Sequence, residues 1–256
     1  MSLKMCAFAS GSKGNCCYVS DGTTELLIDL GISATRAEKC LSLVGADPDR
    51  VDIFVTHAHS DHIGGLKIFC KKHPTAHVYC QRECAYAVGR GAEIAPTVAD
   101  RSVAIGGLKV TALPVPHDVP CFGYIVESDG KKVAVVTDIG VVEAGTLDGL
   151  RDCDIVMLEA NHDPLMLKNN RSYTPVLKAR ISSSHGHLSN GDCAAACAFL
   201  ASCGVKNFIL AHLSEQNNAP LVASSAVERA IADAGVTDAH VAVATQNAMT
   251  GLFEVC

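Results

Sequence analysis

The segment "VTHAHSDHIGG", residues 55–65, constrains this chain more than any other part of its sequence. It follows an apolar run typical of a buried strand, and it places His57, His59, Asp61 and His62 within six residues. Side chains two residues apart at a strand end point the same way, so His57 and His59 can bind one ion, and the following turn can direct Asp61 and His62 toward a second. Chance histidines in a polar loop rarely form such a pattern. We therefore predict a metal site here, with ligands that suit zinc, manganese or iron.

Three more potential ligands each end an apolar run later in the chain. His117 lies in "LPVPHD", Asp138 in "AVVTDIG" and His212 in "FILAHLS". An α/β scaffold places reactive side chains where its strands end, at the edge of the sheet. A single residue of this kind is usually structural. Three of them, added to the six-residue motif, predict a site with two metal ions.

Strand-like and helix-like segments alternate along the chain. The turn "GSKGN" separates two strand-like runs, and an Asp-Gly pair centres a hairpin in "GYIVESDGKKVAVVTD". Helices are predicted over residues 33–45, with Ser33 as N-cap, and from Leu221 to Ala234. The alternation is typical of an α/β protein, but the hairpins argue against an all-parallel sheet. We expect a mixed or two-sheet sandwich with outer helices, and a single domain over residues 1–256 because no linker divides the chain.

The composition indicates a soluble globular chain. Of its 256 residues, 48% are hydrophobic, and no run approaches the roughly 18 apolar residues that span a bilayer. The N-terminus lacks the apolar run of a signal peptide. The 13 cysteines are odd in number and form no C-x-x-C pair, which is not typical of a disulfide framework. We therefore expect a cytoplasmic protein without membrane association, whose cysteines are buried thiols.

The formal net charge of −6 provides no overall attraction to nucleic acid. Two local groups of basic residues occur, one at Lys67, Lys71 and Lys72 and the other at Lys168, Arg171, Lys178 and Arg180. By themselves such groups are more often solvated faces than a nucleic-acid track, and we interpret them as solvated faces.

With H-x-H-x-D-H followed by His, Asp and His at successive strand ends, the sequence resembles the metallo-β-lactamase superfamily from "LLIDLG" to "GLFEV". The resemblance implies an α/β fold, the αββα sandwich of two mixed β-sheets flanked by helices. It also implies two divalent metal ions, zinc or manganese with iron as a further option. A hydroxide between them would be the nucleophile, because two positive charges lower the pKa of water toward neutrality. Carried over to this chain, the ligands of the first ion are His57, His59 and His117, those of the second are Asp61, His62 and His212, and Asp138 bridges the two.

Within the superfamily, the chain resembles the YycJ/WalJ-like branch. The similar segments include "FASGSKGNCCYV", "VTHAHSDHIGGL", "EANHD", "SYTPVLKARISSSHGHLSN" and "LAHLSEQNN". This resemblance implies a nuclease with 5′-to-3′ exonuclease activity on double-stranded DNA. The features of secreted β-lactamases, of nucleases with a long inserted domain and of glyoxalase II-like enzymes are not found in the sequence.

The segment "SSSHGHLSNGD", residues 182–192, resembles a motif of ribonuclease Z, a more distant relative. There a His that precedes a helix is associated, together with an acidic residue, with the scissile phosphate and the leaving-group proton. The matching residues here are His187 and Glu159. An imidazolium held by a carboxylate can supply the acid that phosphodiester cleavage requires. We therefore expect His187 and Glu159, together with the metal ligand Asp61, to take part in catalysis.

Three further residues are candidates for contact with substrate. Ser189 is predicted to N-cap the following helix, with Asp192 at N3, and the free N–H groups of a helix start suit a phosphate. Capping alone explains Ser189 equally well, and Asn190 has the same ambiguity. His162 matches the family pattern and is expected to line the pocket. His185 has no assigned role.

Two interpretations of the function stay open. The first is a metal-dependent phosphodiesterase whose substrate and partner is nucleic acid, in particular DNA. The alternative is a small-substrate metallohydrolase of the same fold that acts on a cyclic phosphodiester, a lactone or a thioester. The acidic net charge favours this alternative, whereas His187, Glu159 and the resemblance favour the nuclease. A non-enzymatic regulator is disfavoured because all seven ligand positions are filled.

Overall fold

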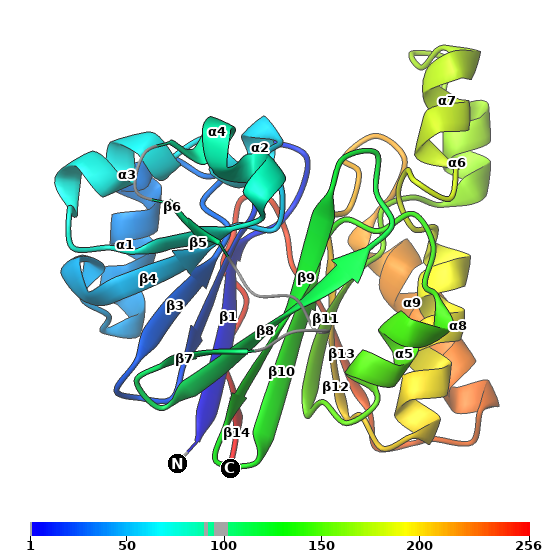
Figure 1. The fold of residues 1–256 in the computed structure, drawn as a ribbon. Coiled ribbons are helices and arrows are strands. Elements are labelled where there is room, and N and C mark those ends of the chain that lie inside the picture. Colours follow the sequence, from blue (N-terminus) through cyan, green and yellow to red (C-terminus); the bar gives the residue numbers. More distant parts are fainter. Residues whose placement is uncertain (1, 90–91, 95–101) are drawn as a thin grey trace.

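A computed structural model describes residues 2–89, 92–94 and 102–256 of the chain. Two seven-stranded β-sheets lie face to face, and helices cover the outer face of each sheet (Figure 1). Each sheet pairs its strands antiparallel on one side and parallel on the other. This architecture confirms the predicted sandwich of two mixed sheets flanked by helices.

Neighbouring strands of each sheet are hydrogen-bonded in the following order. The first sheet consists of β14 (Phe253–Val255), β1 (Leu3–Ala9), β2 (Cys16–Ser20), β3 (Glu25–Ile28), β4 (Val51–Phe54), β5 (Val78–Cys80) and β6 (Ala92–Ile94). The second consists of β13 (His240–Val243), β12 (Asn207–Ala211), β11 (Ile155–Glu159), β10 (Lys131–Val136), β9 (Cys121–Ser128), β8 (Leu108–Val115) and β7 (Val103–Ile105).

The helices divide between the two outer faces and one projecting hairpin (Figure 1). The first sheet carries α1 (Ala34–Val44), α2 (Ser60–Ile63), α3 (Leu66–Lys72), α4 (Ala85–Val88) and the 3₁₀ turns η1 (Pro48–Arg50) and η2 (Arg82–Cys84); the second carries α5 (Ala144–Leu150), α8 (Asn190–Ser202) and α9 (Pro220–Asp233). The hairpin consists of α6 (Pro164–Asn169) and α7 (Pro175–Ile181). None of the helices in the described ranges has both the length and the apolar character needed to cross a membrane.

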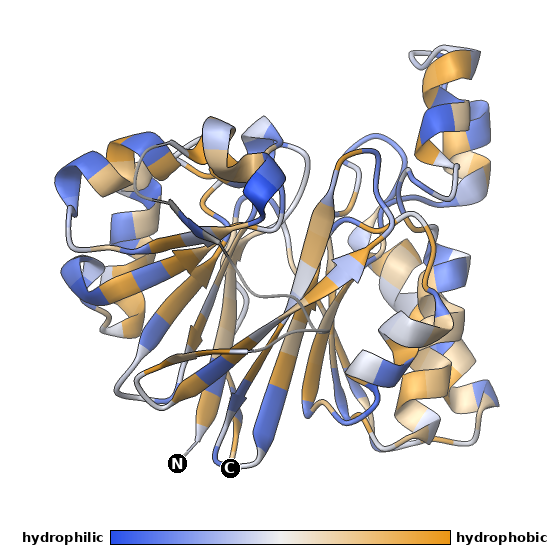
Figure 2. Cartoon of the chain, in the orientation of Figure 1, coloured by the Kyte–Doolittle hydropathy of each residue, from blue (hydrophilic) through white to orange (hydrophobic). Residues whose placement is uncertain are grey.

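The core lies in three layers because alternate residues of each strand point to opposite faces. In β10, Val133 and Val135 point into the layer between the sheets, whereas Ala134 and Val136 point toward the outer helices of the second sheet. Figure 2 shows the result, with predominantly hydrophobic strands inside and hydrophilic segments on the outer helices. Burial on both faces explains why the strands read as apolar runs in the sequence.

The local predictions hold at most element ends. Ser33 accepts a hydrogen bond from the backbone N–H of Arg36 at the start of α1, and Gly45 ends the helix with φ = 78°. Such a left-handed conformation costs glycine little, so the helix stops where the sequence indicated. β9 and β10 form the expected hairpin. The segment "QRECAYAVG" forms the short elements η2 and α4.

The cysteines are free thiols, and all except Cys70, Cys203 and Cys256 are buried. Cys193 and Cys197, one turn apart on α8, have their sulfur atoms 3.9 Å apart. The prediction that the cysteines serve as small apolar core residues is therefore confirmed for most of them.

Loops from both sheets meet at one edge of the sandwich. The motif of residues 57–62 follows β4 in the first sheet, while the loops after β8, β10, β11 and β12 extend from the second. Two hydrogen bonds tie the sheets together there: Tyr124 Oη donates to the Val55 carbonyl at 2.8 Å, and Phe122 N–H donates to the Thr56 carbonyl at 3.0 Å. The predicted strand-end residues are thereby held on a common edge.

Candidate metal centre

Thr56, the residue directly before the H-x-H-x-D-H motif, is held in place by Asp29. Asp29, which follows β3, accepts hydrogen bonds from the backbone N–H of Thr56 at 2.8 Å and from its hydroxyl at 2.8 Å. These contacts fix the chain directly before His57. The short helix α2 then carries Asp61 and His62, so the four side chains leave the backbone from a strand end and from a helical turn.

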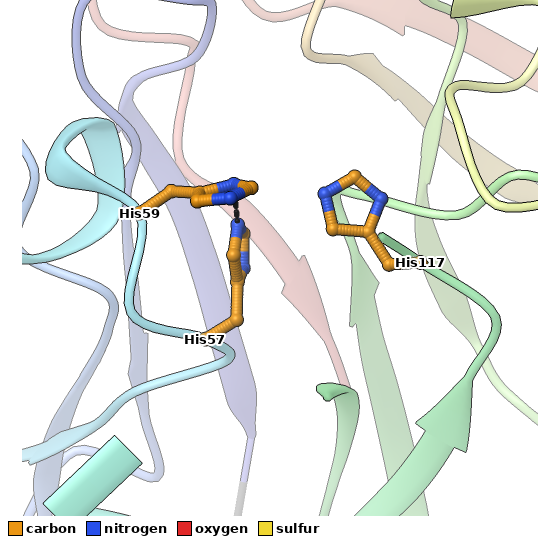
Figure 3. Close-up of side chains that lie close together, drawn as sticks. All are labelled: His57, His59 and His117. Atoms are coloured by element: carbon orange, nitrogen blue, oxygen red, sulfur yellow. Dashed lines mark hydrogen bonds between the residues drawn. The ribbon is translucent and has the colours of Figure 1, made fainter. Parts of the chain in front are cut away.

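The first group of potential ligands contains three histidines, His57, His59 and His117, whose rings point toward one another (Figure 3). His57 Nε2 lies 2.9 Å from His59 Nδ1, and the His57 and His117 ring centroids are 5.1 Å apart. One nitrogen of each ring lies within 4.8 Å of the others. Such a spacing suits three imidazoles around one cation.

The second group contains Asp61, His62 and His212, again with ligand atoms within 4.8 Å of one another. Asp61 Oδ2 lies 3.3 Å from His212 Nε2 and 3.6 Å from His62 Nε2. Asp138 lies between the two groups: its Oδ2 is 3.1 Å from His62 Nε2, and its Oδ1 is 3.8 Å from His117 Nε2. The structure thus brings all seven predicted ligand residues together, and the Asp138 carboxylate lies between the two groups.

Two observations indicate that these residues suit a cation. His117 Nε2 and Asp138 Oδ2 are buried and make no hydrogen bond of acceptable geometry, although a polar atom lies within 3.2 Å of each. Burial also lowers the pKa of His57 to about 2, and the neighbouring His62 adds to the effect. A neutral imidazole keeps the lone pair that a metal requires. The donor set therefore fits divalent metal binding.

The carboxylates give the second group an excess of negative charge. Burial alone lowers the pKa of His212, but Asp138, Asp61 and Glu159 outweigh burial and raise it to about 10. The same field that favours a proton on His212 favours a divalent cation in its place.

A second layer of contacts orients the imidazoles. Asp29 Oδ2 lies 2.6 Å from His62 Nδ1, the Gly186 carbonyl 3.0 Å from His117 Nδ1, and Glu159 Oε1 2.8 Å from His212 Nδ1. Such partners hold Nδ1 and leave Nε2 facing the centre. Asp29 was not predicted from the sequence, although it follows the apolar run "LLI" much as Asp138 follows "AVVT". The same strand-end rule would have identified it.

The predicted pair of His187 and Glu159 is present. His187 Nδ1 lies 2.8 Å from Glu159 Oε1, while Glu159 Oε2 accepts hydrogen bonds from the backbone N–H groups of Ile139 and Leu188. By itself, burial would lower the pKa of His187, but the Glu159 carboxylate has the larger effect and the pKa of His187 is raised. The pair is not isolated, because Glu159 also contacts His212 and because Asp138, Glu159, His187 and His212 together form a further group of possible ligands.

The three candidates for substrate contact differ in their surroundings. Ser189 accepts a hydrogen bond from the Asp192 N–H at the start of α8, which confirms its capping role, and it is partly exposed. Asn190 is 3% exposed and its amide pairs with that of Asn218 through two hydrogen bonds. His162 is also 3% exposed. Asn190 and His162 therefore present little surface to a ligand in this structure, and for Ser189 substrate contact stays a prediction.

A pocket of about 170 Å³ opens beside His187. Asp118, which directly follows His117, lies on its wall and 3.2 Å from His117 Nε2. Arg180 of α7 donates to the Asp118 carboxylate from Nε at 3.0 Å and also from Nη2. Neither residue was predicted to belong to the site, although the position of Asp118 next to a predicted ligand was a signal.

Comparison with known proteins identifies the family. Residues 24–213 match the model of the β-lactamase superfamily domain. The chain is 32% identical over 244 residues to a protein of Bacillus anthracis named exodeoxyribonuclease YycJ, covering 92% of this chain and 91% of the relative. Among solved structures, the metallo-β-lactamase fold protein YhfI of Bacillus subtilis has a TM-score of 0.75 at 14% identity, with both chains covered completely. The short form of human tRNase Z has a TM-score of 0.63 at 17% identity, covering 98% of this chain and 99% of that one.

The two structural neighbours share the fold, and the similarity to the Bacillus anthracis relative extends over almost the whole sequence. The seven candidate ligand residues cluster at the ends of strands from both sheets. This chain belongs to the β-lactamase superfamily, as a metal-dependent hydrolase homologous to the YycJ/WalJ proteins.

Proposed function

We propose that this protein is a dinuclear-metal-dependent phosphodiester hydrolase that acts as a 5′-to-3′ exonuclease on DNA. The observation that carries the proposal is the arrangement of two ligand groups around Asp138, with His187 and Glu159 beside them. The name of the homologous exodeoxyribonuclease supports DNA as the substrate. A DNA substrate is consistent with the cytoplasmic location expected from the sequence.

Zinc or manganese, with iron as a further option, fits a site built from imidazoles and carboxylates. His57, His59 and His117 would hold one ion, Asp61, His62 and His212 the other, and Asp138 both. When bound, the two ions neutralise charge on the phosphoryl oxygens and lower the pKa of a water toward neutrality.

His187 supplies what the metal ligands do not. Its Nδ1 is engaged by Glu159, so Nε2 is the nitrogen left for the substrate, and the side chain lines the pocket beside the centre. An imidazolium there can donate a proton to the leaving oxygen as the phosphodiester bond breaks. Glu159 holds the ring in place and favours its protonated form.

A second candidate function is a small-substrate metallohydrolase that acts on a cyclic phosphodiester, a lactone or a thioester. The net charge of −6 favours it, because a nucleic acid is repelled by an acidic protein at long range. The pocket of about 170 Å³ is also small.

A substrate panel separates the two functions. The metal-loaded protein is offered 5′-labelled and 3′-labelled duplex DNA, RNA, bis-p-nitrophenyl phosphate, a lactone and a thioester. The proposal expects digestion of DNA from its 5′ end. Turnover of the lactone or thioester without turnover of any phosphodiester would overturn it.

A further inference from the structure

The hairpin of α6 and α7, residues 164–181, projects from the sandwich at the edge that carries the metal centre (Figure 1). We name it the basic arm. It contains Lys168, Arg171, Lys178 and Arg180 but no Asp or Glu, in a chain whose net charge is −6. The sequence pattern alone is typical of a solvated face, but the position of these residues relative to the site suggests a more specific role.

The basic arm is held by defined contacts. Asp163 and Thr174 cap its two helices, and Asn170 Nδ2 donates to Asn217 Oδ1 at 2.7 Å. The Lys178 ammonium donates to the Lys168 carbonyl at 2.6 Å and so ties α7 to α6. These hydrogen bonds fix the backbone positions from which the basic side chains extend.

Two basic residues of the arm are uncompensated. Lys168, near the end of α6, and Arg171, in the loop between α6 and α7, are exposed, and within the described residues no carboxylate forms an ion pair with either. An exposed cation without an acidic partner is free to contact an anion.

The base of the arm reaches the active site. Tyr173, Leu177 and Arg180 line the same pocket as His187, and Arg180 pairs with Asp118 beside His117. The arm therefore contributes an aromatic ring and a guanidinium to the pocket, and the unpaired Arg171 lies two residues before Tyr173 in the chain.

We infer that the basic arm binds the sugar-phosphate backbone of a nucleic acid whose terminal nucleotide lies in the pocket beside His187. The inference rests on the proposed function. A polymer with a phosphate at every nucleotide can occupy the pocket and the arm at once, and Tyr173 offers a ring on which a base can stack. This local track would also explain how an acidic protein retains a nucleic-acid substrate.

The arm also exposes Leu165 and Val176, at 67% and 81%, and Figure 2 shows hydrophilic and hydrophobic segments along it. Basic and apolar residues together can bind an anionic membrane. A lipid headgroup carries no chain of phosphates that leads into the pocket, so the continuity with the site favours nucleic acid.

The test measures, by fluorescence anisotropy, the binding of the metal-loaded protein to a phosphorothioate duplex over a range of salt concentrations. Lys168→Ala/Arg171→Ala should lower the slope of log Kd against log salt by about 0.9–1.8, since each phosphate contact contributes about 0.9. At 0.1 M salt this corresponds to a Kd raised roughly 10- to 60-fold. Lys67→Ala/Lys71→Ala, which removes two exposed lysines from α3, is the matched control and should change Kd less than about twofold.

Melting curves of both variants establish that they are folded. A basic-arm variant that matches the α3 control in Kd and slope, while the wild-type protein digests DNA, would overturn this inference and leave the proposed function intact. Binding of the arm to phosphatidylglycerol vesicles, with DNA binding unchanged in the variant, would also overturn it. Failure of the wild-type protein to cleave any phosphodiester would instead refute the proposed function.

Discussion

Replacing His187 with alanine tests the proposed acid on its own. A general acid contributes about 10²–10⁴ in rate, or roughly 3–5 kcal/mol of transition-state stabilisation. The His187 side chain is 24% exposed, so water can reach its place in the variant and supply part of the lost proton transfer. We therefore expect the lower part of the range, a decrease in kcat of about 10²–10³ on duplex DNA.

The leaving group makes this prediction specific. The alkoxide released from DNA needs a proton, whereas p-nitrophenolate is stable without one. His187→Ala should therefore lower kcat on bis-p-nitrophenyl phosphate by less than about tenfold. The assay is steady-state turnover on both substrates, with the metal content of each preparation measured by inductively coupled plasma mass spectrometry.

A neighbouring histidine provides the control. His185 is exposed, and its hydrogen bonds among the described residues are made with serine side chains, so His185→Ala should change neither rate. An equal loss on DNA and on bis-p-nitrophenyl phosphate in His187→Ala would refute the role of a proton donor. Loss of bound metal in that variant would show that His187 is a ligand, which its closeness to Asp138 and His212 also allows.

Three further predictions concern the support of the site and the stability of the fold. Asp29→Asn should weaken metal binding about 10- to 100-fold by removing the charged partner of His62, as measured by competition with a chelator; unchanged affinity would contradict this. Gly31→Ala should lower the free energy of unfolding by about 1–3 kcal/mol, because its Cβ would overlap the Asp61 carbonyl, and chemical denaturation measures the change. Burial alone raises the pKa of Asp21, but hydrogen bonds from the following turn outweigh burial and lower it. A carboxyl group whose pKa is lowered in the folded state stabilises the fold above about pH 4, and this stabilisation is lost as the pH falls further. The stability advantage of the wild-type protein over Asp21→Asn should therefore shrink between pH 7 and pH 3. A constant advantage would speak against it.

The clustering of the candidate ligand residues could be predicted from the sequence because the information is local. His57, His59, Asp61 and His62 form one short motif, and each remaining ligand ends an apolar run. Asp29 also follows an apolar run, but the sequence is equally consistent with a polar residue inside the strand-like segment "ELLIDLG". Its role depends on contact with His62, 33 residues away.

The features that the sequence did not reveal depend on tertiary contacts. Asn190 is satisfied by Asn218, which lies 28 residues further along the chain, and nothing near Asn190 in the sequence indicates that partner. His212 adopts φ = 53°, an unusual conformation for a non-glycine residue, where it is held between Asp61 and Glu159. Arg180 reaches Asp118 only because α7 packs back toward the loop after β8. Periodicity and local spacing contain none of these long-range relations.

The central claim is that two metal ions bound around Asp138 support hydrolysis of DNA. Metal-free protein, prepared with a chelator, is titrated with manganese while nucleotide release from 5′-labelled duplex DNA is followed. We predict that activity is absent without metal and reaches its plateau at two equivalents of manganese per chain. A plateau at one equivalent, or nucleotide release in the presence of excess chelator, would contradict this claim.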